Sequence, residues 1–407
     1  MLLFKADKLA FSQAVAPVAG ILEPKAEEGD PARYLNVRCL GGKLLVYAVR
    51  QDMAALAEIE DPSLFEYPPS SEGKGLALDP CFCVLLDKLK VMGSFTVELP
   101  APSGPDPDGK GPLKALGAAT CTMPSLTKKN EPWDIPSWEP APVPSFGDGP
   151  KATLEAGEFA KLVRQVEFAV GDDGGDIKYR NMLLKVSGTD LHTTTISTGK
   201  LALAKGTHKG STGDFVASVR YVNAAAMAKA LPDREGDAEI LCCGGAGGGM
   251  LVVAQPILRA GKRIILLRSR CARFQDPFNK FEKTIGSLSF KHEIRFRRDQ
   301  ALDLLDRIAV LKEDARLTVG IDPVEKTLGL LKRERRGTKL VGAIPLSACQ
   351  AETFEVEMSD KILKACLDAS EAEEVEIKFS GLQSLSRILL GEGDSLVGYI
   401  QPFVTPK

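Results

Sequence analysis

Residues 181–205 read "NMLLKVSGTDLHTTTISTGKLALAK", and this stretch decides the fold because another part of the chain repeats its pattern. Residues 34–58, "YLNVRCLGGKLLVYAVRQDMAALAE", align with it without a gap. In both stretches a strand-like run reaches a glycine turn, Gly188 or Gly41, a second run follows, and a third begins after a short polar link. Apolar residues that alternate with polar ones across turns are typical of an antiparallel meander with one buried face.

The Gly199–Lys200 pair in the first stretch also resembles part of a phosphate-binding loop. That motif needs a glycine five residues before the Gly-Lys pair and a Ser or Thr directly after it. The chain has Thr194 and Leu201 at these positions. The spacing therefore excludes this nucleotide site and leaves the interpretation as strand, turn and strand.

Helix patterns flank each meander and recur along the chain at one interval. Apolar residues at helical spacing follow helix-capping residue types in each copy. The first helix of each copy starts near Asp7, Gly157 and Asp299, and the second near Asp79, Ser218 and Ser359. Because both sets recur about every 140 to 150 residues, the sequence predicts three tandem copies of one unit. Each unit is expected to pack two helices on an antiparallel sheet, which is an α+β fold.

The repeat interval predicts three domains, at residues 1–148, 149–284 and 285–407. A chain of 407 residues has room for two to four domains of about 100 to 200 residues each. Residues 124–151 are rich in proline, so we expect an extended linker at the end of the first domain.

Composition and charge limit the classes of function. Hydrophobic residues make up 44% and charged residues 26%, which is ordinary for a soluble globular protein. The formal net charge is only −2, so an anionic partner must meet a local basic surface. The sequence has no apolar run of about 20 residues and no signal-peptide pattern, so we expect a cytoplasmic protein. Its nine cysteines and three histidines lack metal-ligand spacing, so we expect neither metal nor cofactor.

Each predicted helix carries lysine or arginine away from its apolar stripe. A single basic residue on a helix is usually just solvated, but six helices that share the feature predict a positively charged surface. Such a surface binds phosphates without reading bases. The residues are Lys8, Lys88, Lys90, Lys161, Arg164, Arg220, Lys229, Arg297, Arg298, Arg307, Lys361 and Lys364.

Four segments make the chain resemble the bacterial DNA sliding clamp, the beta subunit of DNA polymerase III. They are "FKADKLAFSQAVAPVAGIL" (4–22), "IKYRNMLLKVSGTDLHTTTISTGKLALAK" (177–205), "RFQDPFNKFEK" (273–283) and "GYIQPF" (398–403). The resemblance covers nearly the whole chain. It implies a homodimer that pairs head to tail into a ring, with helices lining the hole around double-stranded DNA. It also implies a processivity factor, not an enzyme, that is associated with the nucleoid and binds DNA polymerase and clamp loader through short peptide motifs.

The resemblance also assigns residues to two contact sites. The pocket for partner peptides would consist of Tyr179, Ile196, Leu201, Phe281, Ile400, Pro402 and Phe403. The ring interface would pair Ala118 and Thr120 of the first unit with Val310 and Leu311 of the third. One departure is that Ser197, Thr198, Gly199 and Lys200 replace the family's usual Asp-Gly-His-Arg run. The resemblance therefore does not determine the peptide preference.

Three alternatives stay open at this point. The pocket residues could simply fill a core between the second and third units. The chain could be a clamp-fold paralogue that serves a different set of partners. It could also be an enzyme built on the same repeats, with the acidic loop 171–176 or the polar run 193–197 as candidate sites, although neither has a partnering His or Lys at a recognisable offset.

Overall fold

The computed structural model describes the whole chain except for fourteen short segments. These are residues 89–92, 101–112, 124–130, 172–176, 198, 232, 244–248, 258–262, 272–282, 311–315, 335–336, 382–384, 392 and 402–407. Its contacts divide the chain into two compact units. Unit 1 contains Met1–Ala160, His208–Gly213 and Asn223–Cys271, and unit 2 contains Lys161–Thr207, Asp214–Val222 and Ala272–Lys407.

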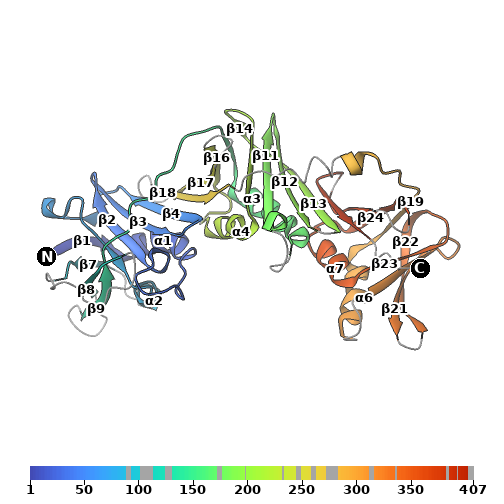
Figure 1. Ribbon diagram of the computed structural model, residues 1–407, viewed down its shortest axis with the longest axis horizontal. Coiled ribbons are helices and arrows are strands. Elements are labelled where there is room, and N and C mark those ends of the chain that lie inside the picture. The colour runs from blue at the N-terminus through green and yellow to red at the C-terminus, as the bar shows by residue number, and fades with distance from the viewer. Residues whose placement is uncertain are drawn as a thin grey trace. The chain divides into compact units, whose positions relative to one another are not determined.

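Unit 1 is built on an antiparallel sheet with the strand order β14-β10-β16-β17-β18-β4-β3-β2-β6-β9-β8-β7-β1-β5. The strands are β1 (Leu2–Asp7), β2 (Leu35–Leu40), β3 (Lys43–Val49), β4 (Met53–Ile59), β5 (Phe65–Glu66), β6 (Gly75–Leu78), β7 (Ser94–Glu98), β8 (Ala115–Met123), β9 (Glu131–Trp138), β10 (Lys151–Glu155), β14 (Gly210–Ser211), β16 (Asp237–Cys243), β17 (Met250–Ile257) and β18 (Arg263–Arg270). The helices α1 (Lys8–Ala19) and α2 (Cys81–Lys88) also belong to this unit. Figure 1 shows β2, β3 and β4 side by side, as the first meander pattern predicts.

Aromatic packing holds the helices of unit 1 to the sheet. Asp7 ends β1 and caps α1, because its carboxylate accepts a hydrogen bond from the Ala10 amide at 2.8 Å. Phe11 of α1 is fully buried, and its ring centroid lies 5.2 Å from that of Phe95 on β7 and 6.1 Å from that of Phe82 on α2. These edge-on contacts join both helices to the same sheet face.

Unit 2 contains the second meander and the C-terminal part of the chain. Its sheet has the strand order β15-β11-β12-β13-β26-β25-β24-β19-β22-β21-β20-β23. The strands are β11 (Asn181–Ser187), β12 (Asp190–Ser197), β13 (Lys200–Thr207), β15 (Phe215–Arg220), β19 (His292–Arg297), β20 (Arg316–Asp322), β21 (Thr327–Glu334), β22 (Gly337–Gln350), β23 (Phe354–Ser359), β24 (Glu374–Phe379), β25 (Ser386–Leu389) and β26 (Leu396–Ile400). The helices α6 (Arg298–Val310) and α7 (Asp360–Asp368) lie side by side in this unit (Figure 1).

The predicted strand, turn and strand of residues 181–205 is confirmed. β11 pairs with β12, and β12 pairs with β13, in antiparallel register. The turns fall at Gly188 and Gly199, whose φ angles of 60° and 77° lie in the left-handed region that favours glycine. The expected α+β class, with helices on antiparallel sheets, is confirmed as well.

The predicted helix starts agree with the structure except at one position. Ser359 caps α7, and its hydroxyl accepts a hydrogen bond from the Ile362 amide at 3.3 Å. The prediction for Ser218 was wrong, because this residue lies inside β15 and pairs with Leu183 of β11. The ladder continues through Arg220, and α4 (Tyr221–Ala230) begins only after it.

The middle third of the chain contributes strands to both sheets. From residues 149–284, β10, β14, β16, β17 and β18 belong to the sheet of unit 1, and β11, β12, β13 and β15 belong to the sheet of unit 2. The helix α3 (Ala156–Gln165) spans the division of the chain at residue 160. The three domain boundaries expected from the repeat remain a prediction. The expected linker at 124–151 was wrong in part, because Glu131–Trp138 form β9, which pairs with β6 and β8 in the sheet of unit 1. Within the described ranges, none of the helices is long and apolar enough to cross a membrane.

Candidate functional site

The second meander carries an apolar cluster on one face of its sheet. Ile196 and Leu201 face each other across β12 and β13, and the side chain of Leu201 also lies beside Tyr399 of β26. The buried members of this cluster are Leu183, Ile196, Leu201, Val397 and Tyr399. Partly buried residues pack around them, namely Tyr179, Leu203, Ile285, Phe290, Leu385 and Leu389. The structure thus brings together three of the pocket residues that the resemblance implied.

The opposite face of β12 shows which side of the sheet the cluster occupies. Thr193 and Thr195 alternate with the cluster residues, and their hydroxyl groups donate to the backbone carbonyls of Leu162 and Val166 at the end of α3. The apolar cluster therefore lies on the face away from this end of α3. These two buried threonines complete the hydrogen bonding of a helix end, which gives Thr193 and Thr195 of the polar run 193–197 a structural role.

Ile400 does not lie with the apolar cluster. It pairs with Lys200 on one side and Ser386 on the other, one position beyond Tyr399, so its side chain is on the other face of the sheet. It is fully buried there. The remaining expected pocket residues, Phe281, Pro402 and Phe403, lie outside the described residues.

Several members of the apolar cluster escaped sequence reasoning although a signal for them exists. Leu183 and Leu203 lie on the same face of the sheet as Ile196 and Leu201, and Val397 lies on the same face as Tyr399. Two-residue periodicity alone places such residues on one face. The missing information was the pairing of β13 with β26, which joins residues almost 200 positions apart.

The border of the apolar cluster is partly open to solvent. Tyr179 and Leu203 are half-buried, whereas Ile196 is fully buried. Asn181, on the same face of β11 as Leu183, is 8% exposed, and its Oδ1 has no hydrogen-bond partner among the described residues. A rim of partly exposed apolar side chains suits a short peptide that inserts hydrophobic anchors. The fully buried residues alone would also fit a simple core.

The basic residues expected on helices are all at least partly exposed where the structure describes them, and Lys90 lies outside that part. The helical placement was wrong for Arg220 and Arg297, which are the last residues of β15 and β19. Several have carboxylate partners on their own unit. Lys161 and Arg164 pair with Glu371 at 3.2 and 2.7 Å. Arg297 pairs with Asp299, Arg307 with Asp303, and Lys364 with Asp368 and Asp306. These exposed pairs are weak, so the cations can exchange to other anions.

Of the expected interface residues that the structure describes, Ala118 and Val310 are exposed and Thr120 is half-buried. Ala118 is exposed on β8, and β9 follows that strand from Ala115 to Met123, whereas β7 pairs with it only from Thr120 to Thr122. Val310 ends α6 with a side chain that is 77% exposed, and Leu311 lies outside the described residues.

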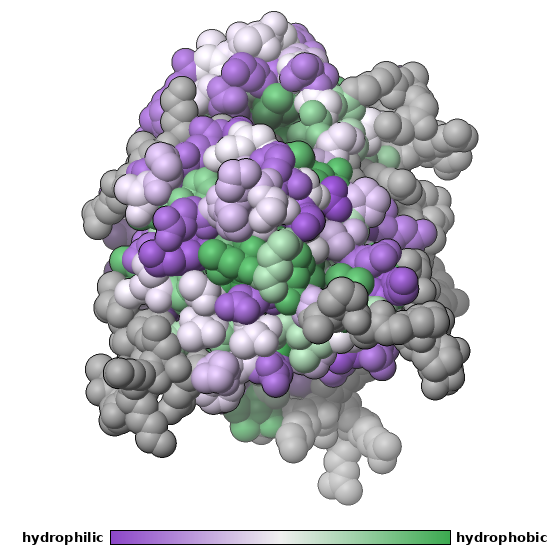
Figure 2. All heavy atoms as spheres, turned by 90° about the vertical axis from the view of Figure 1, so that its left-hand side faces the viewer, coloured by the Kyte–Doolittle hydropathy of each residue, from purple (hydrophilic) through white to green (hydrophobic). Residues whose placement is uncertain are grey.

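Figure 2, which views the side of the molecule at the left of Figure 1, shows a patch of hydrophobic residues among mainly hydrophilic ones.

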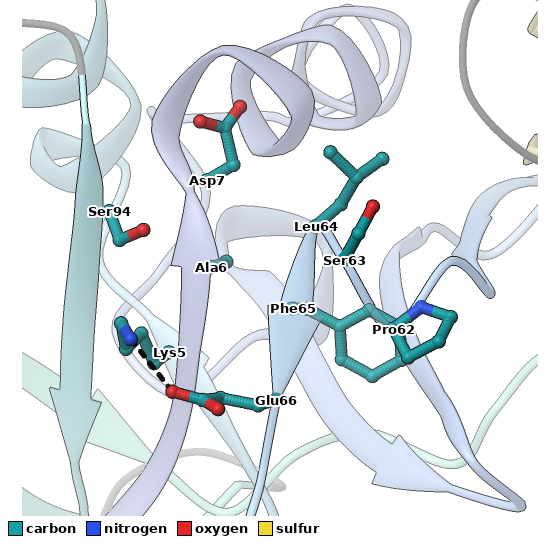
Figure 3. A pocket seen from close by; sticks show the side chains of 9 residues that line it. All are labelled: Lys5, Ala6, Asp7, Pro62, Ser63, Leu64, Phe65, Glu66 and Ser94. Carbon is teal, nitrogen blue, oxygen red and sulfur yellow. Dashed lines mark hydrogen bonds and ion pairs between the residues drawn. The ribbon is translucent and has the colours of Figure 1, made fainter.

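A small open pocket lies beside the start of α1 in unit 1 (Figure 3). It is lined by Lys5, Ala6, Asp7, Pro62, Ser63, Leu64, Phe65, Glu66 and Ser94. Its charged groups already have partners, because Lys5 pairs with Glu66 at 2.8 Å and Asp7 caps the helix. We therefore assign no ligand to it. Among the described residues, no group of three or more His, Cys, Asp or Glu is placed to hold a metal ion.

The fold is similar to solved structures of bacterial sliding clamps. A DNA polymerase sliding clamp from Bacillus subtilis matches with a TM-score of 0.81 at 15% identity, over 99% of each chain. A putative DNA polymerase III beta subunit from Eubacterium rectale gives 0.79 at 14%, and a clamp from Pseudomonas aeruginosa bound to griselimycin gives 0.77 at 13%, again over 99% of each chain. No family model and no curated protein matches the sequence. The chain therefore has the fold of the bacterial DNA polymerase III beta subunits, the DNA sliding clamps.

Proposed function

We propose that this protein is a DNA sliding clamp, a processivity factor without catalytic activity. The observation that supports this function most is the match to bacterial clamps over 99% of the chain. A partly open apolar cluster at the second meander adds to it. In this proposal two copies form a closed ring around duplex DNA in the cytoplasm, and no membrane is involved.

A closed ring retains DNA by topology, so no single contact to DNA has to be strong. The exposed lysines and arginines of the helices would bind phosphates without reading the sequence of bases. Their existing ion pairs, such as Lys161 with Glu371, are exposed and weak, so phosphate contacts can form and break as the ring slides. The protein would need no cofactor to encircle DNA.

The apolar cluster would hold the partner proteins. A DNA polymerase or clamp loader would insert the hydrophobic anchors of a short peptide motif between Leu201, Tyr179 and their neighbours. Tethering a polymerase in this way makes its return to the primer end an intramolecular event with a high effective concentration. Processivity follows from this tethering.

The ring hypothesis predicts that the protein stays on circular DNA and leaves linear DNA. The clamp is loaded with its cognate loader and ATP onto nicked circular plasmid, and the retained protein is measured by gel filtration in 0.3 M salt before and after linearisation. We expect a dimer by sedimentation and a loss of most retained protein on linearisation, because open ends let a ring slide off. A monomer, or retention that ignores DNA ends, would contradict the proposal.

A second candidate is a clamp-fold paralogue that serves a different set of partners. Two observations favour it over a standard clamp: Ser197, Gly199 and Lys200 depart from the usual Asp-Gly-His-Arg run, and Ile400 lies on the face away from the apolar cluster. The two candidates differ in one measurement. Submicromolar to low-micromolar binding of the clamp-motif peptide from the host's own replicative polymerase supports the first, and its absence alongside a normal ring supports the second.

A further inference from the structure

A row of three basic side chains lies next to the apolar cluster on the same face of the sheet. His192 of β12 pairs with Lys185 of β11 on one side and with Lys205 of β13 on the other. Each is two residues from a position on the cluster face: Leu183, Thr194 or Leu203. Two residues along a strand return to the same face about 7 Å further on. We call Lys185, His192 and Lys205 the basic row.

The basic row is exposed enough to meet a ligand. Lys185 is exposed, and His192 and Lys205 are half-buried. The carboxylate of Asp190, on the same strand, lies 3.9 Å from His192 Nε2. In the part of the chain that the structure describes, neither Lys185 nor Lys205 has a carboxylate within ion-pair distance.

Several other cross-strand lysines of the molecule have a carboxylate partner. On neighbouring strands, Lys43 lies 2.7 Å from Glu58, Lys151 lies 2.8 Å from Glu239, and Lys378 lies 2.9 Å from Glu293. Opposite charges across a sheet stabilise it, and like charges directly opposite each other destabilise it. Lys185 and Lys205 instead flank a histidine, so this part of the sheet carries a positive charge that an outside anion can neutralise.

We propose that the basic row is an anion-binding subsite of the peptide pocket. It binds Asp or Glu side chains next to the hydrophobic anchors of a partner peptide. The inference rests on the proposed peptide site at the apolar cluster. The chemistry of the ligand can be inferred from two properties of this surface. One half is apolar and binds hydrophobic anchors, and the other half, about two residues away, is cationic. A peptide that binds both has an acidic flank.

His192 makes this subsite sensitive to pH. Burial lowers the pKa of His192 from its ordinary value, the charges of Lys205 and Lys185 lower it further, and Asp190 opposes them. The imidazole is therefore neutral near pH 7 and gains its proton only as the pH falls. A bound carboxylate favours the protonated form, so binding takes up a proton. The carboxylates of the peptide stay ionised above about pH 5.

The test compares two peptides on the full-length protein. Both carry the same hydrophobic clamp motif and a fluorescent label; one is followed by three glutamates and the other by three glutamines. Dissociation constants are measured by fluorescence anisotropy in 50 mM salt at pH 7.5 and 6.0. We expect the acidic peptide to bind about three to ten times more tightly than the neutral one, from two or three exposed charge contacts. The advantage should grow at pH 6.0 and shrink in 0.5 M salt.

Single substitutions locate the effect. Lys185→Gln and Lys205→Gln should each remove about a twofold to fourfold part of the advantage, and His192→Gln should remove its growth at pH 6.0. Lys291→Gln is the matched control, because Lys291 is an exposed lysine of unit 2 directly before β19. It should leave both affinities unchanged. Melting curves identify any variant that is misfolded.

The outcomes separate the subsite from the pocket. If the wild-type protein binds both peptides equally, the proposed anion-binding subsite is wrong, but the proposed peptide pocket is not affected. No binding of either peptide at 1 mM overturns both. If Lys185→Gln and Lys205→Gln weaken the binding of a short DNA duplex while peptide affinities stay the same, the basic row is a DNA contact and the inference is wrong.

Discussion

Among single residues, Cys242 differs chemically from the deeply buried cysteines of the chain. It lies on β16 and is half-buried, and a hydrogen bond with the thiol of Cys271 lowers the pKa of Cys242 to about 7. Burial instead raises the pKa of Cys39 and of Cys121 to about 12. The thiolate is the reactive form of cysteine, so Cys242 should behave as the nucleophile of this group.

Alkylation should therefore begin at Cys242. With iodoacetamide at pH 7.5 we expect Cys242 to be labelled well before Cys39 and Cys121, and its rate to rise with pH up to about 8 and then level off, as the thiolate fraction does. Peptide mapping by mass spectrometry over a time course measures this. Cys271→Ala should slow the labelling of Cys242 at pH 7.5 because the hydrogen-bond donor is gone. Equal labelling rates in the two proteins would show that Cys271 does not activate Cys242.

Among the elements, α7 depends on a single cap. The hydroxyl of Ser359 accepts from the Ile362 amide, and the helix places Leu363, Cys366 and Leu367 in the core. We expect Ser359→Ala to lower the local stability of α7 by about 1 kcal/mol, because an amide of the first turn loses its partner. Hydrogen exchange of the α7 amides measures this loss directly, which matters in a chain with two compact units where one melting temperature is ambiguous.

Ser359→Asp is the control for the cap. Aspartate also accepts from an amide at this position and adds favourable charge at the helix start, so exchange should stay near the wild-type rate. If alanine and aspartate accelerate exchange to the same extent, the role of Ser359 lies in β23, where it pairs with Arg316, and not in the cap.

The sequence predicts an element well when the pattern that determines it lies within one short segment. The meander of residues 181–205 could be predicted because alternation and a glycine turn are both local. Ser218 looked like a helix cap, but its pairing with Leu183 extends the strand past it. The apolar cluster could be predicted only in part for the same reason. Ile196 and Leu201 are opposite each other within the meander, whereas Tyr399 and Ile400 are consecutive residues of β26 and so lie on opposite faces of the sheet. Strand register between distant segments decides such positions, and composition does not contain it.

At the scale of the whole molecule, the proposed ring depends on contacts between two copies. Val310 is 77% exposed at the end of α6, at one of the expected interface positions. We expect Val310→Asp to weaken the dimer at least tenfold, because a charge buried in an apolar interface loses its hydration. Sedimentation at low micromolar concentration should then show mainly monomer. Retention on circular DNA should fall with it, while peptide binding persists.

Val324→Asp makes the same change at a comparable exposed position. Val324 is 85% exposed in the turn between β20 and β21, and it is not part of the expected interface. This variant should remain a dimer. If both variants dissociate the dimer equally, added negative charge is the cause and Val310 has no special role. If neither does, the expected interface is wrong.

The way in which the middle third of the chain is shared between two sheets has a consequence for damage to the backbone. A protease that cuts near residue 160 or residue 271 severs the covalent connection between stretches that belong to different units. The fragments would still be joined, because β4 pairs with β18 and β13 pairs with β26 across such cuts. A nicked chain can therefore keep the strand pairing of both sheets, and a fragment cut out at 149–284 would carry two unprotected sheet edges, at β18 and β13.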